Sequence, residues 1–255
     1  MSKSYRTSIT THVDGKPYVY GYDLTKLAGE VSFARAIYLI LKGEMPDKNS
    51  QKIFEAILTI SLDHGLEPPS VVAARNIYSG GSPVQAAVAG GILALGEYHG
   101  GAIEAAMENF LKYCPPASQR GEPAGTGVDQ LIDDFAKSGL RIAGFGHRLY
   151  EVDPRTTRLV AIAKDLGFYG KYVKFAQNVE DKLSKGGKRL PLNIDGIIAA
   201  LLLEMDFNPK FGKGIFIIAR TSGLVAHVVE EALREKPFRR LSESDVEYDG
   251  PRPRK

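Results

Sequence analysis

After about residue 22, apolar residues recur at helical spacing through almost the whole chain. In residues 49–62, for example, Ile53, Phe54, Ile57 and Leu58 share one helical face. The exception is residues 8–22, where β-prone residues lie on both sides of Asp14-Gly15, a turn signal. The sequence therefore predicts a mainly α-helical fold with a small N-terminal β arm.

Glycine, proline and capping residues divide the rest of the chain into separate helices. Asp23 is expected to cap the first of them, and the segment AAVAGGILALG is small and apolar all round, so it is expected to be buried in a helix-packed core or a subunit interface. The expected helices cover residues 23–42, 49–62, 69–78, 83–96, 102–112, 128–137, 155–166, 172–182, 194–206 and 211–235. The last twenty or so residues have no helical period and are expected to lie over the protein or a neighbouring subunit.

Composition excludes several classes of protein. The 255 residues are 44% hydrophobic and 25% charged, which is ordinary for a globular protein. A net charge of +3 is too near balance to indicate a nucleic-acid partner, and charges break the apolar runs before the length of a membrane span. The single cysteine, Cys114, excludes an internal disulfide, and no Cys or His cluster suggests a metal. Without a signal peptide the default location is cytoplasmic.

The stretch of residues 141–158, RIAGFGHRLYEVDPRTTR, is the strongest candidate for a functional site. Gly144 and Gly146 allow a tight turn and a close approach of the backbone to a ligand, which places His147 on a turn. Asp153-Pro154-Arg155 is typical of a helix start, where free N–H groups and a guanidinium suit a carboxylate or phosphate. The simpler alternative is a glycine loop followed by a capped helix with solvated arginines.

These motifs resemble the signature of the citrate synthase superfamily: Gly144-Phe145-Gly146-His147-Arg148, then Asp153-Pro154-Arg155. The resemblance extends from about residue 21 to residue 235 and includes several separated motifs in the family's order. It implies a two-domain helical fold. Residues 1–100 and 207–255 would form a large domain, and residues 101–206 a small one that binds coenzyme A and carries the catalytic aspartate, with closure on substrate.

The resemblance also implies roles for the residues that match the family's motifs. Asp195 would take or return the methyl proton of acetyl-CoA, while His99 donates a hydrogen bond to the thioester oxygen, where charge develops. His147 would exchange a proton with the keto or hydroxyl oxygen of the four-carbon unit. His147 would thus also bind the substrate, through this oxygen, and the carboxylates of oxaloacetate would be held by His64, Arg155, Arg220 and Arg240. Taken singly, a histidine at a helix end is most often a structural group.

Coenzyme A, as the thioester, is the cofactor that the resemblance implies, with no metal. The segment Ile142, Gly144, Phe145 and Gly146 would contact the adenine, with Arg148 and Asn193 also at the coenzyme site. The basic loop 185–189 is a further candidate for phosphate contacts, although a solvated charge run is the simpler interpretation.

The family resemblance also implies that a neighbouring subunit completes the carboxylate site through an arginine of its C-terminal tail. Arg239 or Arg240 is the candidate, with Arg240 preferred. A homodimer or a higher oligomer is therefore expected. His12 and His227 are left as surface or core residues.

The layout is shorter than that of a full-length citrate synthase. Only one helix separates Gly43-Glu44-Met45-Pro46 from His64, as in citryl-CoA lyases and the C-terminal module of ATP-citrate lyase. The expected function is cleavage of citryl-CoA to acetyl-CoA and oxaloacetate, with a separate citryl-CoA synthetase as a possible supplier. A short citrate or 2-methylcitrate synthase is the alternative, and a non-catalytic module that binds coenzyme A is a remote one.

Overall fold

The fold was obtained as a computed structural model, which describes residues 5–97, 99–114, 126–146, 152–186 and 190–254. By its internal contacts the chain divides into two compact units. The first unit comprises Met1–Leu62 and Gly96–Ala219, and the second comprises Asp63–Leu95 and Arg220–Lys255. The sequence predicts a different division, with a large domain of residues 1–100 and 207–255 and a small domain of residues 101–206 that close on substrate. That division stays a prediction.

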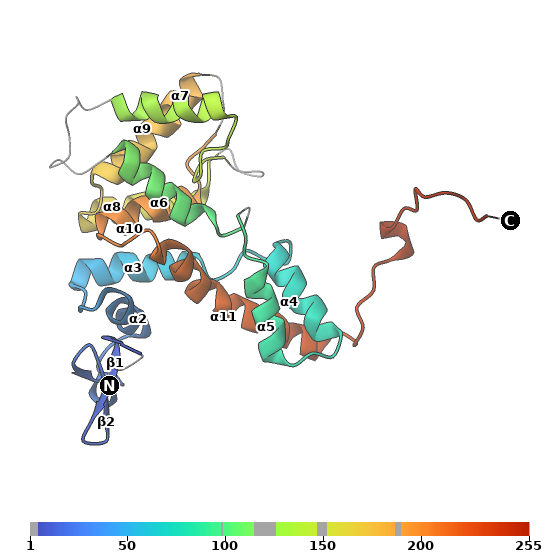
Figure 1. The fold of residues 1–255 in the computed structure, drawn as a ribbon, viewed down its shortest axis with the longest axis horizontal. Coiled ribbons are helices and arrows are strands. Elements are labelled where there is room, and N and C mark those ends of the chain that lie inside the picture. The colour runs from blue at the N-terminus through green and yellow to red at the C-terminus, as the bar shows by residue number, and fades with distance from the viewer. Residues whose placement is uncertain (1–4, 98, 115–125, 147–151, 187–189, 255) are drawn as a thin grey trace. The chain divides into compact units, whose positions relative to one another are not determined.

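The first unit begins with the expected β arm (Figure 1). Strand β1 (Thr10–Val13) pairs antiparallel with β2 (Lys16–Val19), which pairs with β3 (Tyr22–Asp23). Asp14 and Gly15 both have positive φ, 48° and 73°, as a two-residue hairpin turn of the favoured hand requires. The prediction of a small N-terminal hairpin is confirmed.

The predicted helix over residues 23–42 is wrong, because the structure has two helices there. Asp23 caps the short α1 (Leu24–Leu27), and α2 (Phe33–Lys42) starts afresh at its own cap, Ser32, whose hydroxyl accepts from the Arg35 N–H. Gly29, with φ of +90°, turns the chain between them. The break lets Leu27 and Leu39 pack with Val19 in a small core under the β arm.

In the described part of the chain nine further helices follow, with bounds close to the predicted ones. Helix α3 starts after Asp47, not at Asn49 or Ser50, because the Asp47 carboxylate accepts from both of those N–H groups. The helices are α3 (Lys48–Ile60), α4 (Pro69–Ser79), α5 (Val84–Leu93), α6 (Ala102–Tyr113), α7 (Thr126–Ser138), α8 (Pro154–Leu166), α9 (Lys171–Lys185), α10 (Ile194–Glu204) and α11 (Phe211–Arg234). The short 3-10 helix η2 (Glu243–Asp245) lies in the tail.

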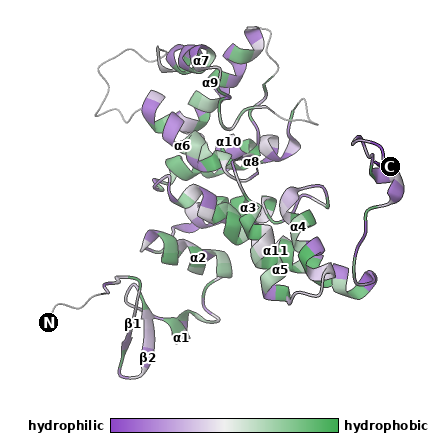
Figure 2. Ribbon diagram, turned by 45° about the vertical axis from the view of Figure 1, so that its right-hand side comes forward, coloured by the Kyte–Doolittle hydropathy of each residue, from purple (hydrophilic) through white to green (hydrophobic). Residues whose placement is uncertain are grey.

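Helix α10 is the centre of the first unit. It packs against α6, α8 and α9, and every residue from Gly196 to Leu203 is buried. The amphipathic helices α7 and α9 carry hydrophilic as well as hydrophobic residues along their length (Figure 2). Because α10 is enclosed on several sides, its first turn, which carries Asp195, is held in a fixed place in this unit.

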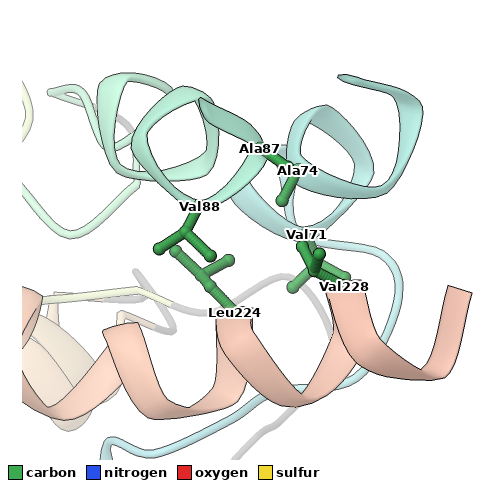
Figure 3. Close-up of a cluster of buried hydrophobic side chains, with 6 residues drawn as sticks. All are labelled: Val71, Ala74, Ala87, Val88, Leu224 and Val228. Carbon is green, nitrogen blue, oxygen red and sulfur yellow. The ribbon is translucent and has the colours of Figure 1, made fainter. Parts of the chain in front are cut away.

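The second unit is built from α4, α5 and the C-terminal part of α11. Its core joins Val71 and Ala74 of α4, Ala87 and Val88 of α5, and Leu224 and Val228 of α11 (Figure 3). Gly91 makes this packing close, since a Cβ there would lie 2.8 Å from the Ser70 carbonyl oxygen. The predicted burial of this small-residue helix in a helix-packed core is confirmed at Ala87, Val88 and Gly91, and the burial of exposed Leu93 in a subunit interface stays a prediction.

Helix α11 is long and apolar enough to cross a membrane by length and composition, a property that it shares with core helices of soluble proteins. It also carries two charged residues that are buried within the protein, Arg220 and Glu231. The expectation that the chain has no membrane partner stays a prediction.

Candidate functional site

The glycine turn at residues 142–146 is bonded along its length to the segment that precedes α10. The Gly146 N–H donates to the Pro191 carbonyl at 2.7 Å, and the Asn193 N–H donates to the Gly144 carbonyl at 3.0 Å. Phe145 and Leu192 form the antiparallel bridge between these two bonds. The structure therefore brings together the predicted coenzyme segment and the start of the helix that carries Asp195.

The Asn193 side chain ties the same two segments together. Its Oδ1 accepts from the N–H groups of Asp195 and Gly196, at 3.0 and 3.1 Å, so it is the N-cap of α10. Its Nδ2 donates to the Gly146 carbonyl at 2.9 Å. One amide thus fixes the turn that holds Asp195 to the residue directly before His147.

Gly144 lies where three segments meet. Its φ is +88°, and a Cβ on it would lie 2.7 Å from the Gly196 Cα and 3.3 Å from the Ala106 Cβ. Ala106 belongs to the second turn of α6 and Gly196 to the first turn of α10. A side chain at position 144 would force these helices away from the turn, so glycine is required here for backbone conformation and for space.

Asp195 is half-buried in the first turn of α10. The N-terminus of a helix carries partial positive charge, which favours the carboxylate form of an acid placed there. A carboxylate that is partly removed from water, at the positive end of a buried helix, is chemically suited to take a proton from carbon or return it.

Glu180 of α9 binds the segment that leads into α10, a role that sequence reasoning missed. Its Oε1 accepts from the Leu192 N–H at 2.9 Å, one residue before the Asn193 cap. Burial raises the pKa of Glu180, and the bond from Leu192 offsets only part of that effect. Nothing in the local sequence marks Glu180, because its partner is a backbone group of another segment.

His99 lies in the turn that leads into α6. Its N–H donates to the Gly96 carbonyl at 3.1 Å, and its ring meets the Phe216 ring edge-on, with centroids 6.3 Å apart. Gly100 has φ of +77°, and a Cβ there would lie 2.6 Å from the Phe216 ring, so the ring of Phe216 closes over the turn. This packing sets the position of His99 before the positive end of α6.

Arg155 is held by the residue that caps its own helix. Asp153 is fully buried, caps α8 through the Arg155 N–H, and accepts from Arg155 Nε at 3.0 Å and Nη2 at 2.8 Å. The predicted cap and the proline at the first helical position are confirmed. These two hydrogen bonds to Asp153 orient the Arg155 guanidinium. Substrate binding by Arg155 stays a prediction.

Part of the predicted site lies outside the described residues. His147, Arg148 and three residues of the basic loop, 187–189, are among them. Their predicted roles stay predictions.

In the second unit, His64 lies in an exposed turn fixed by its neighbour Asp63. One oxygen of Asp63 accepts from the Gly65 N–H at 2.9 Å, and the other lies 2.9 Å from Nε2 of His227 on α11. Burial alone would raise the pKa of Asp63, but the bonds from Gly65 and His227 outweigh it, so that pKa is lowered. His227, left unassigned by sequence reasoning, therefore anchors the turn that presents His64.

The two predicted arginines of this unit have opposite environments. Arg220 of α11 is 3% exposed, whereas Arg240, in the tail, is exposed and lies over the Phe238 ring with its Cζ 5.0 Å from the centroid. Arg239, the other tail candidate, is bound to Glu231 of α11 through two hydrogen bonds. Its guanidinium is already engaged, which favours Arg240 as the residue available to a substrate.

No group of three or more His, Cys, Asp or Glu side chains is arranged to hold a metal ion within the described ranges. A hollow of the second unit is lined by the end of α4, the start of α5 and the end of α11, including Ser79 and Glu231. None of the predicted site residues lines that hollow.

Comparison with known proteins identifies the family of this chain. Residues 46–241 match the family model described as "Citrate synthase, C-terminal domain". The chain is 30% identical, over 227 residues, to Citrate/2-methylcitrate synthase of Bacillus subtilis; the match covers 87% of this chain and 57% of that protein. The chain spans between about a third and just over half the length of the curated relatives that it matches first.

Solved structures agree over a greater length. The fold matches citryl-CoA lyase from Hydrogenobacter thermophilus with a TM-score of 0.89 and 46% identity, covering 99% of this chain and 97% of that one. It also matches ATP citrate lyase from Methanothrix soehngenii, solved with citrate and coenzyme A, with a TM-score of 0.82, 21% identity and 98% and 42% coverage. The second match shows the fold alone. With its glycine turn, its capped α10 and the family model matching most of its length, the chain belongs to the citrate synthase family.

Proposed function

We propose that this chain is a citryl-CoA lyase, which cleaves citryl-CoA to acetyl-CoA and oxaloacetate. The observation that carries the proposal is the 46% identity to a citryl-CoA lyase over nearly the whole of both chains. The same match supports the lyase over a synthase, because the identity to the curated Bacillus synthase is lower, at 30%.

The chemistry follows from the residues in the site. His147 takes the proton of the citryl hydroxyl as the carbon–carbon bond breaks, which leaves oxaloacetate and the enolate of acetyl-CoA. His99 donates a hydrogen bond to the enolate oxygen, and the positive end of α6 favours the same charge. Asp195, protonated at this point, gives its proton to the enolate carbon and so forms the methyl group of acetyl-CoA.

Binding is divided between two sets of residues. The coenzyme is held by the glycine turn, through Ile142, Gly144, Phe145 and Gly146, with Arg148 and Asn193. The carboxylates of the four-carbon acid are held by His64, Arg155, Arg220 and, from a second copy of the chain, Arg240. Guanidinium groups suit this task because each can pair with a carboxylate through two parallel hydrogen bonds.

The protein acts as a homodimer or a higher oligomer in the cytoplasm. It needs no metal, because the enolate charge is stabilised by hydrogen-bond donors. A lyase consumes citryl-CoA, so a separate citryl-CoA synthetase is the partner that supplies this substrate.

A short citrate or 2-methylcitrate synthase is the second candidate, favoured by the 30% identity to the Bacillus enzyme. The residues that make and break the carbon–carbon bond are the same in both directions. The two candidates differ in the fate of the thioester, which a lyase leaves intact in acetyl-CoA and a synthase hydrolyses.

Proton exchange tests the enolate chemistry and separates an enzyme from a module that only binds coenzyme A. Wild-type protein in heavy water is expected to place deuterium in the methyl group of acetyl-CoA when a four-carbon acid is present. Asp195→Asn should abolish exchange, and His99→Ala should slow it by about 10²–10³. Asp165→Asn, a substitution at an exposed position of α8, is the matched control. Coenzyme A binding without exchange in the wild type would overturn the proposal.

A further inference from the structure

The Glu231 carboxylate of α11 lies between two arginines. Arg75 of α4 donates from Nε at 2.6 Å, and Arg239 donates from Nε at 3.0 Å and from Nη2 at 2.6 Å. Glu231 is only 2% exposed and Arg75 only 8%. We call Arg75, Glu231 and Arg239 the tail clamp, because it joins two helices of the second unit to the first residues of the tail.

The backbone of the tail is held at the same point. The Phe238 N–H donates to the Ser79 carbonyl at 2.8 Å, and the Arg239 N–H donates to the Ser79 hydroxyl, both at the end of α4. Phe238 has a φ of +63°, which a bulky side chain rarely adopts, so its surroundings must impose the turn. The chain direction at residues 238–239 is therefore fixed by backbone bonds and by an ion pair.

The clamp acts on the tail and not on the end of the helix. Helix α11 ends at Arg234, and residues 235–237 separate it from the first clamped backbone group. A buried carboxylate with two guanidinium partners is costly to break, because removal of one partner leaves charge uncompensated. Such an arrangement is well suited to hold a segment that has no secondary structure of its own.

Beyond Arg239 the tail changes character. Arg240 and the residues that follow it are exposed, and the hydrogen bonds of described residues 242–254 lie within the tail itself, such as Ser242 to Asp245 and Tyr248 to the Pro251 carbonyl. This part of the tail, which we call the tail arm, also carries three exposed apolar side chains, those of Leu241, Val246 and Tyr248. Of the two adjacent arginines, Arg239 therefore anchors the tail to Glu231, and Arg240 is exposed to solvent.

We propose that the tail clamp is a positioning device, in which Arg239 fixes the root of the tail so that Arg240 is held ready for a substrate carboxylate at the site of a second copy. This inference rests on the proposed role of Arg240 in a neighbouring site. A fixed root restricts where the arm can reach, which raises the effective concentration of Arg240 at that site. Arg239 is accordingly a positioning residue and makes no contact with substrate.

Mixed dimers test this role directly. An Asp195→Asn copy cannot perform the proton transfer but still offers its tail, and an Arg240→Ala copy keeps Asp195 but lacks the tail arginine. Each is expected to be nearly inactive alone, and differently tagged copies that are co-expressed and purified as mixed dimers should regain one working site. The readouts are kcat and KM for citryl-CoA.

Arg239→Ala is then placed on either copy. On the Asp195→Asn copy, whose arm is in use, it should raise KM about fivefold to tenfold with kcat changed less than about twofold. Arg239→Lys in the same place should recover part of the loss, because a lysine still pairs with Glu231. On the Arg240→Ala copy, whose arm is not in use, Arg239→Ala should leave both constants unchanged.

The placement on the unused arm is the matched control, since both dimers contain the same substitution once. Equal losses from either placement would mean that Arg239 only stabilises the fold, and the positioning role would be overturned. Mixed dimers that regain no activity would overturn the cross-copy role of Arg240 itself, and the role of the clamp with it.

Discussion

The side chain of Asn193 makes three hydrogen bonds that join the start of α10 to the glycine turn. Its oxygen caps the helix that carries Asp195, and its nitrogen holds the carbonyl of the residue before His147. One amide therefore fixes the first turn of α10, with Asp195, to the glycine turn at Gly146. The family resemblance assigned Asn193 to the coenzyme site, and the structure adds this second role.

Asn193→Asp separates the two roles of this amide. Aspartate can still cap α10, but it cannot donate to the Gly146 carbonyl and places a negative charge beside it. We expect the melting temperature to stay close to that of the wild type while kcat for citryl-CoA cleavage falls at least about tenfold, equivalent to about 1.4 kcal/mol. Asn193→Ala should also lose about 1 kcal/mol of unfolding free energy. An Asn193→Asp variant with full kcat would contradict this role.

Glu231 gives the protein a specific dependence on acid. Burial alone would raise the pKa of this carboxyl group, but hydrogen bonds from Arg239 and Arg75 outweigh burial and lower it. The unfolded chain therefore binds a proton more readily than the folded one. The stability that this group contributes is present above the usual carboxyl pKa of about 4.3 and is lost as the pH falls through the lowered value.

Chemical denaturation at several pH values measures this effect. The free energy of unfolding should fall less steeply below about pH 4.3 in Glu231→Gln than in the wild type. Glu231→Gln should also be less stable at neutral pH, because Arg75 is left buried without its carboxylate. Glu55→Gln, at an exposed position of α3, controls for loss of a carboxylate. Identical pH slopes for wild type and Glu231→Gln would refute the assignment.

At the scale of elements, the close packing of α4, α5 and α11 depends on Gly91. A Cβ there would lie 2.8 Å from the Ser70 carbonyl oxygen and 3.0 Å from the Ala74 Cβ. The neighbouring Gly90 differs, because its Cβ would meet the Cδ1 tip of the Ile77 side chain, which can rotate away. The two glycines are adjacent on one helix, so they form a matched pair.

Gly91→Ala should therefore cost about 1–3 kcal/mol of unfolding free energy, the usual range for overpacking. Gly90→Ala should cost less, because the tip of the Ile77 side chain can move aside. The gain of up to about 1 kcal/mol in helix propensity of alanine over glycine is then not offset by a backbone clash. Thermal or denaturant unfolding of both variants checks the difference. Equal losses would show that the contact between α4 and α5 does not determine the effect.

Element bounds were predictable where local chemistry decides them. Asp153-Pro154 at the start of α8 and the Asp14-Gly15 hairpin turn were both predicted, since cap and turn residues act through bonds to near neighbours. The break between α1 and α2 was not, because Val31 and Leu27 continue the helical period across it while Gly29 and Ser32 end it. Periodicity outweighed the stop signal in that prediction.

In the candidate site, too, the features predicted from the sequence are those with a local pattern. Motifs identified Asp195, His99 and the glycine turn, but the residues that support them act over long sequence separations. Glu180 holds Leu192, and His227 holds Asp63 from 164 residues away. Such pairs leave no local pattern, because Glu180 and His227 are ordinary polar residues on their own helices and their partners lie in other segments of the chain.

At the scale of the whole molecule, the two compact units carry different parts of the chemistry. The first contains the glycine turn, His99, Asp195 and Arg155, and the second contains His64, Arg220 and the tail. The residues proposed for the enolate chemistry therefore lie in the first unit, and most of the proposed carboxylate ligands lie in the second.

The fate of citryl-CoA is the measurement that tests the central proposal most directly. Purified protein is mixed with citryl-CoA, oxaloacetate is followed through a coupled dehydrogenase, and acetyl-CoA, citrate and free coenzyme A are quantified by chromatography. A lyase is predicted to release oxaloacetate and acetyl-CoA in equal amounts with little citrate. Citrate and free coenzyme A as the main products would contradict the proposal and would identify the protein as a synthase.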